Sequence, residues 1–323
     1  MNSIPSEVAV VVCAYSEVRW SLLARCIDSL RTQSTPAAEV VVVIDHNPAL
    51  WERAKTAFAD MTVVENSDVR GLSGARNTGI RHSSAPIVAF IDDDAVAEPD
   101  WVRALSAPFA DFAVMAVGGR IEPLWDRKTP RWLPPEFYWV VGCSYRGMPD
   151  EVAPIRNVIG ANMAFRRAVF GAIGLFRNGV GRLGETPFGC EETELSIRAR
   201  QHWPNRSIMF APDAIVHHRI PVKRCRLPYF ARRCFAEGRS KAQVTALVGA
   251  EDGLATERTY TRVTLPRGAR TGLADCLIRG DVTGLARTAA IAGGLLITTG
   301  GYLRGRMSGF DARVERAPSL VSD

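Results

Sequence analysis

The 323-residue sequence lacks several patterns that would decide its class at once. Its seven cysteines form no C-x-x-C pair, which argues against a zinc knuckle and against a redox-active dithiol. Residues 1–7 carry no charged-then-apolar signal pattern, so we expect the chain to begin in the cytosol with reduced thiols. With 47% hydrophobic and 23% charged residues, the composition excludes a disordered chain, a collagen and a disulfide scaffold.

Two nucleotide-binding patterns are also missing. No G-x-G-x-x-G follows the first apolar run, where Cys13, Ala14 and Tyr15 stand instead, and this argues against a dinucleotide-binding dehydrogenase. No Walker A sequence is present.

The net charge of +6 predicts acidic partners, and phosphorylated ligands, an anionic membrane surface and nucleic acid all qualify.

Short apolar runs alternate with helix-like segments through the first third of the chain. We expect strands over residues 8–14, 40–44, 61–64 and 86–91, helices over 18–33 and 49–59, and a loop followed by a helix within 71–82, with Ser73 as the N-cap. This alternation predicts an α/β fold whose sheet is mostly parallel, with helices on both faces. Farther along, we expect a mobile glycine-rich loop over 176–189 and a helix over 191–202.

Polar or aromatic clusters follow three of the predicted strands. They are Cys13-Ala14-Tyr15, Asp45-His46-Asn47 and Asp92-Asp93-Asp94. Because the carboxyl ends of parallel strands meet at one edge of a sheet, these clusters should converge on a ligand. Alternate residues of an extended segment point the same way, so Asp92 and Asp94 can face one divalent cation. The alternative for the aspartates is a solvated turn.

The helix that begins after Gly71 offers a second anion site. Its N-terminal amides favour negative charge, and Arg76 adds a charge-assisted donor, although an ordinary helical arginine is an equal alternative. A nucleotide base could stack on Tyr15 and hydrogen-bond to Asp45.

At this point the chain resembles the family 2 glycosyltransferases. The motifs are Cys-Ala-Tyr-Ser-Glu after the first strand, Asp45, Ala75-Arg76-Asn77-Thr78-Gly79-Ile80, Ile91-Asp92-Asp93-Asp94-Ala95 and Cys190-Glu191-Glu192-Thr193-Glu194-Leu195. The resemblance covers roughly residues 6–240. It implies a GT-A fold, a nucleotide-sugar donor, with a UDP-sugar favoured, and Mg²⁺ or Mn²⁺ as cofactor. The site residues it implies are Cys13, Ala14, Tyr15, Glu17, Asp45, Arg76, Asp92 and Asp93 for the donor, Asp94 and His218 for the metal, and Asn162 and Arg219 for the acceptor.

The acidic pair departs from that family. Where Glu191-Glu192 stands here, the family usually has Glu-Asp, with the aspartate as general base. The resemblance therefore implies Glu192 as the base, with Glu191 as the alternative, while favourable charge in the first turn of a helix would also explain both. His218 follows the apolar stretch 208–216 and would suit Mn²⁺ beside carboxylates, or else simply ends a strand.

The last third of the chain is basic and then apolar. Eight Lys and Arg side chains occur within residues 219–241, among aromatics, which suits an acceptor with a diphosphate and a lipid tail or a solvated helical face. The apolar run 288–303 either lies in a membrane interface or packs back on the protein. We expect a GT-A-like domain over residues 1–225 and a C-terminal helical appendage over 226–323.

The sequence thus predicts an inverting, metal-dependent glycosyltransferase. The Gln-x-x-Arg-Trp segment and the membrane helices of the family's processive synthases are missing, so we expect transfer of a single sugar. The expected acceptor is a hydroxyl of a glycan or of a lipid-linked sugar of the cell envelope. The alternatives are a nucleotidyltransferase and a non-catalytic protein that binds nucleic acid or membrane. We expect no nucleic-acid partner. The expected location is the cytoplasm, with the inner face of the cell membrane as the alternative.

Overall fold

The structure is a computed structural model that describes residues 7–180, 189–249, 259–308 and 317–320. Its strands are β1 (Val8–Ala14), β2 (Glu39–Ile44), β3 (Thr62–Glu65), β4 (Ile87–Asp92), β5 (Ala95–Ala97), β6 (Val114–Trp125), β7 (Ala153–Ile155), β8 (Asn162–Arg166) and β9 (Ser207–Ile220). Its longer helices are α1 (Trp20–Arg31), α2 (Pro48–Ala57), α3 (Leu72–Arg81), α4 (Trp101–Ser106), α5 (Arg167–Ile173), α6 (Glu191–His202), α7 (Leu227–Val248), α10 (Leu265–Arg279) and α11 (Thr283–Met307). Short helical turns are η1 (Glu17–Arg19), η2 (Ala107–Ala110), η3 (Pro135–Val141), η4 (Val222–Cys225) and η5 (Tyr260–Thr264).

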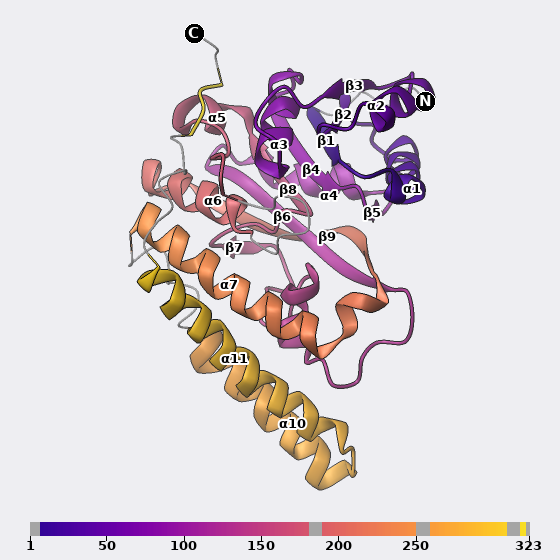
Figure 1. Ribbon diagram of the computed structural model, residues 1–323. Coiled ribbons are helices and arrows are strands. Elements are labelled where there is room, and N and C mark those ends of the chain that lie inside the picture. Colours follow the sequence, from indigo (N-terminus) through magenta and orange to yellow (C-terminus); the bar gives the residue numbers. More distant parts are fainter. Residues whose placement is uncertain (1–6, 181–188, 250–258, 309–316, 321–323) are drawn as a thin grey trace.

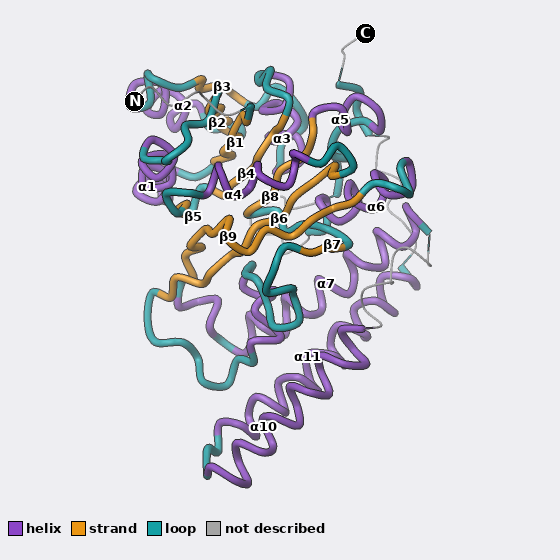
Figure 2. The backbone as a smooth tube through the Cα atoms, turned by 180° about the vertical axis from the view of Figure 1, so that it is seen from behind, coloured by secondary structure: helices purple, strands orange, loops and turns teal. Residues whose placement is uncertain are grey.

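One mixed sheet forms the centre of the molecule, in the order β3-β2-β1-β4-β8-β6-β9-β5, with β7 added beside β9 (Figure 2). The α/β fold with flanking helices is confirmed. The first four strands run parallel, as the alternation predicts. Beyond them β8 is antiparallel to both neighbours, and β9 is parallel to β6 but antiparallel to β5 and β7. The parallel arrangement therefore holds for the half of the sheet that β1 to β4 form and not for the whole sheet.

Helices cover both faces of this sheet because β1, β2 and β4 are apolar on both sides. On one face Val10 and Val12 pack with buried residues of α1 and α2, such as Leu23 and Leu50. On the other face Val11 packs with residues of α3, α5 and α6. Each predicted strand and helix of the first third is confirmed to within two or three residues.

The predicted N-cap of α3 is wrong. Gly71, with a φ of 126°, occupies the cap position, and only glycine adopts that backbone conformation at low cost. The hydroxyl of Ser73 instead donates to the carbonyl of Val180, at 2.6 Å. The predicted glycine-rich loop lies largely outside the described residues, since 181–188 are not among them.

The C-terminal helices pack against the body of the protein. Helix α11 lies along α7, and Figure 1 shows α10 and α11 as a hairpin that extends away from the sheet. The contact is close because glycines form it: a Cβ on Gly238 would approach the Thr298 carbonyl oxygen to 2.0 Å. Phe230 of α7 and Ile291 of α11 belong to the same buried cluster as β1. Among the described residues, no helix combines the length and the apolar character that crossing a membrane requires.

Candidate active site

The three predicted clusters meet at one edge of the sheet. Strands β1 and β4 pair Cys13 with Asp92, and β1 and β2 pair Ala14 with Ile44, the residue before Asp45. A cavity of about 580 Å³ opens there, which we call the strand-end cavity. The predicted donor residues that line it are Cys13, Ala14, Tyr15, Asp45, Asp92 and Asp93. Parallel strand ends thus build this cavity as expected.

Three side chains at this edge could hold a metal ion. Asp92, Asp94 and His218 each offer a ligand atom, and these atoms all lie within 4.8 Å of one another. His218 reaches the cluster because β9 pairs it with Ala95, next to Asp94, and its Nε2 lies 3.2 Å from Oδ1 of Asp94. Two carboxylates and an imidazole form a donor set that suits Mn²⁺ or Mg²⁺, with the nitrogen favouring Mn²⁺.

Positive charge surrounds Asp94. Burial alone would raise the pKa of its carboxyl, but the charge and hydrogen bond of His218, together with Arg19 and Arg224, outweigh it and hold the pKa well below its ordinary value. The ionised form of the Asp94 carboxyl is therefore favoured, and Arg19 already pairs with it. Asp93 shares Arg19 with Asp94, at 2.6 Å from its own Oδ1, yet burial raises the pKa of Asp93 to about 8.

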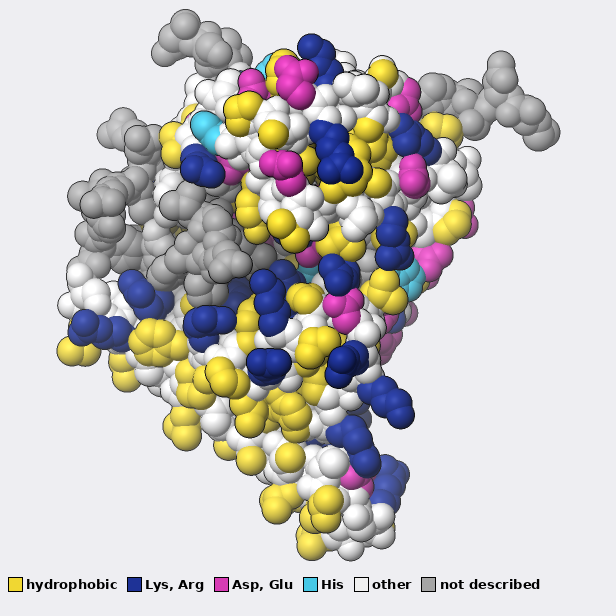
Figure 3. Space-filling model, turned by 45° about the vertical axis from the view of Figure 1, so that its right-hand side comes forward, with side chains coloured by type: hydrophobic (Ala, Val, Ile, Leu, Met, Phe, Trp, Pro, Cys, Tyr) yellow, Lys and Arg dark blue, Asp and Glu magenta, His cyan; other side chains and the backbone are white. Residues whose placement is uncertain are grey.

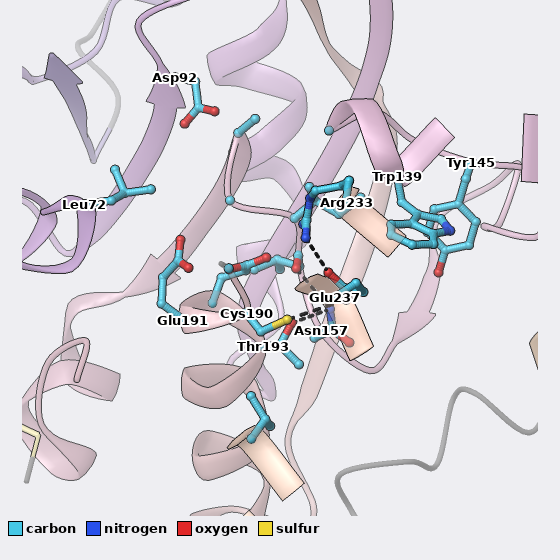
Figure 4. Close-up of a pocket in the computed structure, with 18 of the residues that line it drawn as sticks. Leu72, Asp92, Trp139, Tyr145, Asn157, Cys190, Glu191, Thr193, Arg233 and Glu237 are labelled. Carbon is cyan, nitrogen blue, oxygen red and sulfur yellow. Dashed lines mark hydrogen bonds and ion pairs between the residues drawn. The ribbon is translucent and has the colours of Figure 1, made fainter. Parts of the chain in front are cut away.

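A second cavity, of about 210 Å³, lies between η3, the start of α6 and α7, and we call it the helix-side cavity. The two cavities share Leu72, Asp92 and Arg224, and His218 lines the second. In Figure 4, Asp92, Leu72 and Glu191 lie at one end, Trp139 and Tyr145 lie at the other, and Arg233 and Glu237 lie between them. The metal-type cluster therefore stands where the two cavities join.

The two glutamates at the start of α6 have different surroundings. Glu191 is buried and pairs with Arg76, whose Nη1 lies 2.6 Å from its Oε1. Arg76 is also buried, donates to the carbonyl of Gly160 at 3.0 Å and lies 3.8 Å from Asp92. Glu192 lines the helix-side cavity, where desolvation and then the neighbouring Glu191 charge raise its pKa to about 8.

The two glutamates both line the helix-side cavity but differ in their partners. Glu191 belongs to a buried ion pair with Arg76, so Arg76 holds α6 rather than standing in the strand-end cavity. Glu192 stands beside Glu191 on the same cavity wall, and its raised pKa is the property that a base acting near neutral pH would need.

Three predicted site residues do not reach either cavity. Asn162 is fully buried, and its amide donates to the carbonyls of Arg120 and Ala214 while its oxygen accepts from Trp101. Its amide joins neighbouring strands, and Asn162, the predicted acceptor residue, lines neither cavity. Arg219 pairs with Asp126 at 2.8 Å, outside both cavities, and exposed Glu17 lines neither.

Asp45 reaches the strand-end cavity but is already engaged. Its carboxylate accepts from the amide of Asn66 at 2.7 Å and from the backbone N–H of Gly71 at 3.0 Å. These bonds hold the loop that leads into α3, so this wall of the cavity is ordered without a ligand.

The sequence analysis missed much of the helix-side cavity. Its aromatic end consists of Trp139, Tyr145 and Tyr260, and the indole N–H of Trp139 donates to the Tyr260 hydroxyl at 2.9 Å. Its charged wall includes Arg156 and three residues of α7, namely Arg233, Glu237 and Lys241. One signal was available: the α7 residues recur every four positions, which places them on one face of a helix.

Solved structures identify the fold. A mannosyltransferase from Pyrobaculum calidifontis, PcManGT, solved with GDP-Man and Mn²⁺, matches with a TM-score of 0.57 over 92% of this chain and 89% of that one, at 20% identity. GalNAc-T7, solved with UDP, GalNAc and Mn²⁺, matches with a TM-score of 0.54 over 89% of this chain and 55% of that one, at 17% identity. The architecture is the GT-A glycosyltransferase fold, as the sequence predicts.

Sequence comparisons give the family. The model of Glycosyl transferase family 2 matches residues 9–174. The chain is 34% identical over 239 residues to the glucosyl-dolichyl phosphate glucuronosyltransferase of Haloferax volcanii, covering 73% of this chain and 76% of that protein. It is 25% identical over 249 residues to the succinoglycan biosynthesis protein ExoM of Rhizobium meliloti, covering 74% and 75%. The protein belongs to glycosyl transferase family 2 and is a glycosyltransferase enzyme.

Proposed function

We propose that this enzyme transfers one sugar from a nucleotide-sugar donor to an acceptor hydroxyl, with inversion at the anomeric carbon. The observation that carries the proposal is the position of Asp92, Asp94 and His218 at the junction of the two cavities, with Glu192 on the wall of the second. A donor in the strand-end cavity and an acceptor in the helix-side cavity would meet at that junction.

The donor side of the proposal rests on the chemistry of the strand-end cavity. Tyr15, which is 42% exposed, offers a ring for the base, and Asp45 lies near it. Arg70, Lys223 and Arg232 also line this cavity and would meet phosphate oxygens. A divalent cation held by Asp92, Asp94 and His218 would neutralise charge on the departing diphosphate. A UDP-sugar is favoured, although the two solved relatives bind a guanosine and a uridine nucleotide respectively.

In the proposed chemical step, one bond forms, one bond breaks and one proton is transferred. The acceptor hydroxyl oxygen attacks the anomeric carbon from the side opposite the diphosphate, while Glu192 takes the hydroxyl proton. The bond between the anomeric carbon and the diphosphate oxygen breaks, and the nucleoside diphosphate leaves with its electron pair. General-base assistance of this kind contributes about 10²–10⁴-fold to the rate.

The acceptor side favours a sugar attached to an anionic lipid. Trp139 and Tyr145 provide apolar faces for a sugar ring, and Arg156 and Lys241 provide positive charge for a phosphate. The Haloferax volcanii relative is named for an acceptor of this kind, a glucosyl-dolichyl phosphate. We extend the proposal to a lipid-linked sugar, with a cell-envelope glycan as the product class. The nucleotidyltransferase and non-catalytic alternatives are set aside because the chain is a family 2 glycosyltransferase.

A donor panel tests the proposal. Thermal unfolding is followed with UDP- and GDP-sugars, each with Mn²⁺, with Mg²⁺ and with chelator. We expect stabilisation by one nucleotide class that requires the metal. Transfer to a synthetic glycosyl polyprenyl phosphate is then followed by NMR, and a product with the anomeric configuration of the donor would contradict an inverting mechanism.

A further inference from the structure

Helix α11 carries an apolar stripe on the side that faces away from the protein. Leu285, Leu296, Leu303 and Met307 are 55%, 73%, 56% and 79% exposed. They are 11, 7 and 4 residues apart, spacings that return to nearly the same side of a helix. The positions between them on that side are Ala289, Ala292 and Thr299, which are exposed and uncharged.

The stripe continues into the turn of the hairpin. Leu277, Ile278 and Val282 are 84%, 82% and 75% exposed where α10 passes into α11. In Figure 3, yellow side chains follow the lower edge of the molecule down to its tip. Scattered apolar residues on a surface are normal, but a contiguous set of this kind marks a contact surface.

The exposure of the stripe does not mean that α11 lacks a packing partner within the protein. The opposite side of α11 is fully engaged: Ile291 is buried in the core, and a Cβ on Gly294 would approach the Phe137 ring to 2.4 Å. Of the two places that the sequence analysis gave for the apolar run, a membrane interface or the protein itself, the structure shows packing on the protein for one side of α11. One side packs on α7, and the other side lies open.

The charge around the stripe has one sign. Residues 259–308 contain seven arginines and two aspartates. Both aspartates pair with arginines: Asp275 with Arg279 and Arg287, and Asp281 with Arg131 and Arg287. Arg304 and Arg306 flank the C-terminal end of the stripe and are exposed, as are Arg267 and Arg270 on α10. An uncharged stripe among exposed arginines is complementary to an apolar layer beneath anionic headgroups.

We propose that the outer side of the α10–α11 hairpin docks on an anionic lipid bilayer, in the plane of the interface. The leucines and Met307 would enter the boundary between headgroups and acyl chains, and the arginines would meet lipid phosphates. Self-association through the same stripe is disfavoured because it would bring two positively charged hairpins together. The surface is separate from both cavities, so the proposal does not depend on the reaction assigned above.

Vesicle sedimentation of the full chain tests this, without donor or acceptor. We compare neutral phosphatidylcholine vesicles with vesicles that contain phosphatidylglycerol, at low and high salt. We expect binding to the anionic vesicles that weakens with salt, as electrostatic attraction requires. Leu296→Asp/Leu303→Asp should lower the bound-to-free ratio at least about tenfold, since it removes two apolar anchors and adds two negative charges.

Two controls keep the result interpretable. Phe112→Asp changes an 84% exposed apolar residue on the catalytic body and should bind vesicles like the unaltered protein. Melting temperature and nucleotide-dependent stabilisation of the double variant should be unchanged, because both leucines are on the surface. Equal vesicle binding by the double variant and the unaltered protein overturns the proposal. A dimer that fails to bind vesicles, and that the double variant converts to a monomer, overturns it in favour of a second copy of the chain.

Discussion

The two cavities of this enzyme are built in opposite ways. The strand-end cavity takes its floor from the ends of β1, β2 and β4, all within the first hundred residues. The helix-side cavity takes its walls from η3, the segment around 156–161, α6, β9, α7 and η5. The first is a consequence of parallel strand geometry, which gathers successive strand ends at one edge. The second depends on tertiary packing, so its residues share no local pattern. The difference implies that damage to each cavity should have a different kinetic signature.

The strongest test concerns the junction of the cavities. Asp94→Ala should abolish metal-dependent stabilisation by the nucleotide and lower transfer by about 10²–10³-fold or more, as removal of one preorganised electrostatic contact does elsewhere. Thermal shift with UDP and Mn²⁺ measures the binding, and circular dichroism checks the fold. Because Asp94 also pairs with Arg19, Asp94→Asn is the matched variant that keeps its shape. Asp213→Ala, on the exposed side of β9, is the control. Mn²⁺-dependent binding retained in both Asp94 variants would remove this residue from the metal site.

Glu192→Gln should act on the helix-side cavity alone. We expect kcat to fall about 10²-fold or more while donor binding stays nearly unchanged, because the amide keeps the size of the side chain but cannot accept the proton. Steady-state kinetics with varied donor and acceptor separate the two effects. Loss of donor affinity equal to the loss of rate would contradict the division between the cavities.

Glu191→Gln is the companion variant, and the structure makes its expected result different. Removing the charge leaves buried Arg76 without its ionic partner, so the free energy of unfolding should fall by up to about 3–5 kcal/mol. Chemical denaturation measures this. If the two variants lose rate equally and neither loses stability, helix-terminus charge explains both. If only Glu191→Gln is inactive while folded, the base is Glu191.

The pH dependence should report the same residue. Desolvation and the Glu191 charge raise the pKa of Glu192 to about 8, and a carboxyl accepts a proton only when ionised. Below that pKa, kcat should therefore rise about tenfold per pH unit and then level off above it. Rates between pH 6 and 9, under donor saturation, measure the profile. A flat profile in this range would mean that chemistry is not limited by Glu192 ionisation.

The smallest effect is expected at the charged wall of the helix-side cavity. Lys241→Gln should raise KM for a phosphate-bearing acceptor by about three- to tenfold and leave kcat and donor KM alone, as expected for one charge-assisted contact. Arg239→Gln is the matched control because it stands two residues away on α7, is exposed and lines neither cavity. Equal effects of the two substitutions would indicate general electrostatic attraction instead of a subsite.

The same contrast explains what the sequence could predict. The sequence alone predicts the strand Val8–Ala14, because an unbroken apolar run is recognisable without knowledge of its neighbours. It also predicts the site at Asp92-Asp93-Asp94, because these carboxylates directly follow another apolar run. The role predicted for His218 came from the resemblance, and the structure explains how pairing with β5 brings it to Asp94. The antiparallel placement of β8 was not predictable, since its strand length and apolar pattern do not encode direction.

Asn162 shows why a polar residue in a strand is hard to interpret. Its amide donates both of its hydrogen bonds within the protein, to the carbonyls of Arg120 and Ala214, which belong to two other strands. Nothing local distinguishes such a structural amide from one that binds a ligand. Trp139 and Tyr260 were missed for the related reason that 121 positions separate two side chains joined by a hydrogen bond. Contacts between residues so far apart in the sequence depend on the whole fold.

The bond between Arg76 and Glu191 has an evolutionary consequence. It joins positions 115 residues apart, one in the middle of α3 and one at the start of α6. An isolated charge buried at either position is strongly unfavourable, so replacing either residue alone should cost much of the stability of the fold. Descendants of the same ancestral chain should keep both or exchange both together. The pair thus ties the history of the Ala75-Arg76-Asn77 motif of α3 to that of the Cys190-Glu191-Glu192 motif at the start of α6.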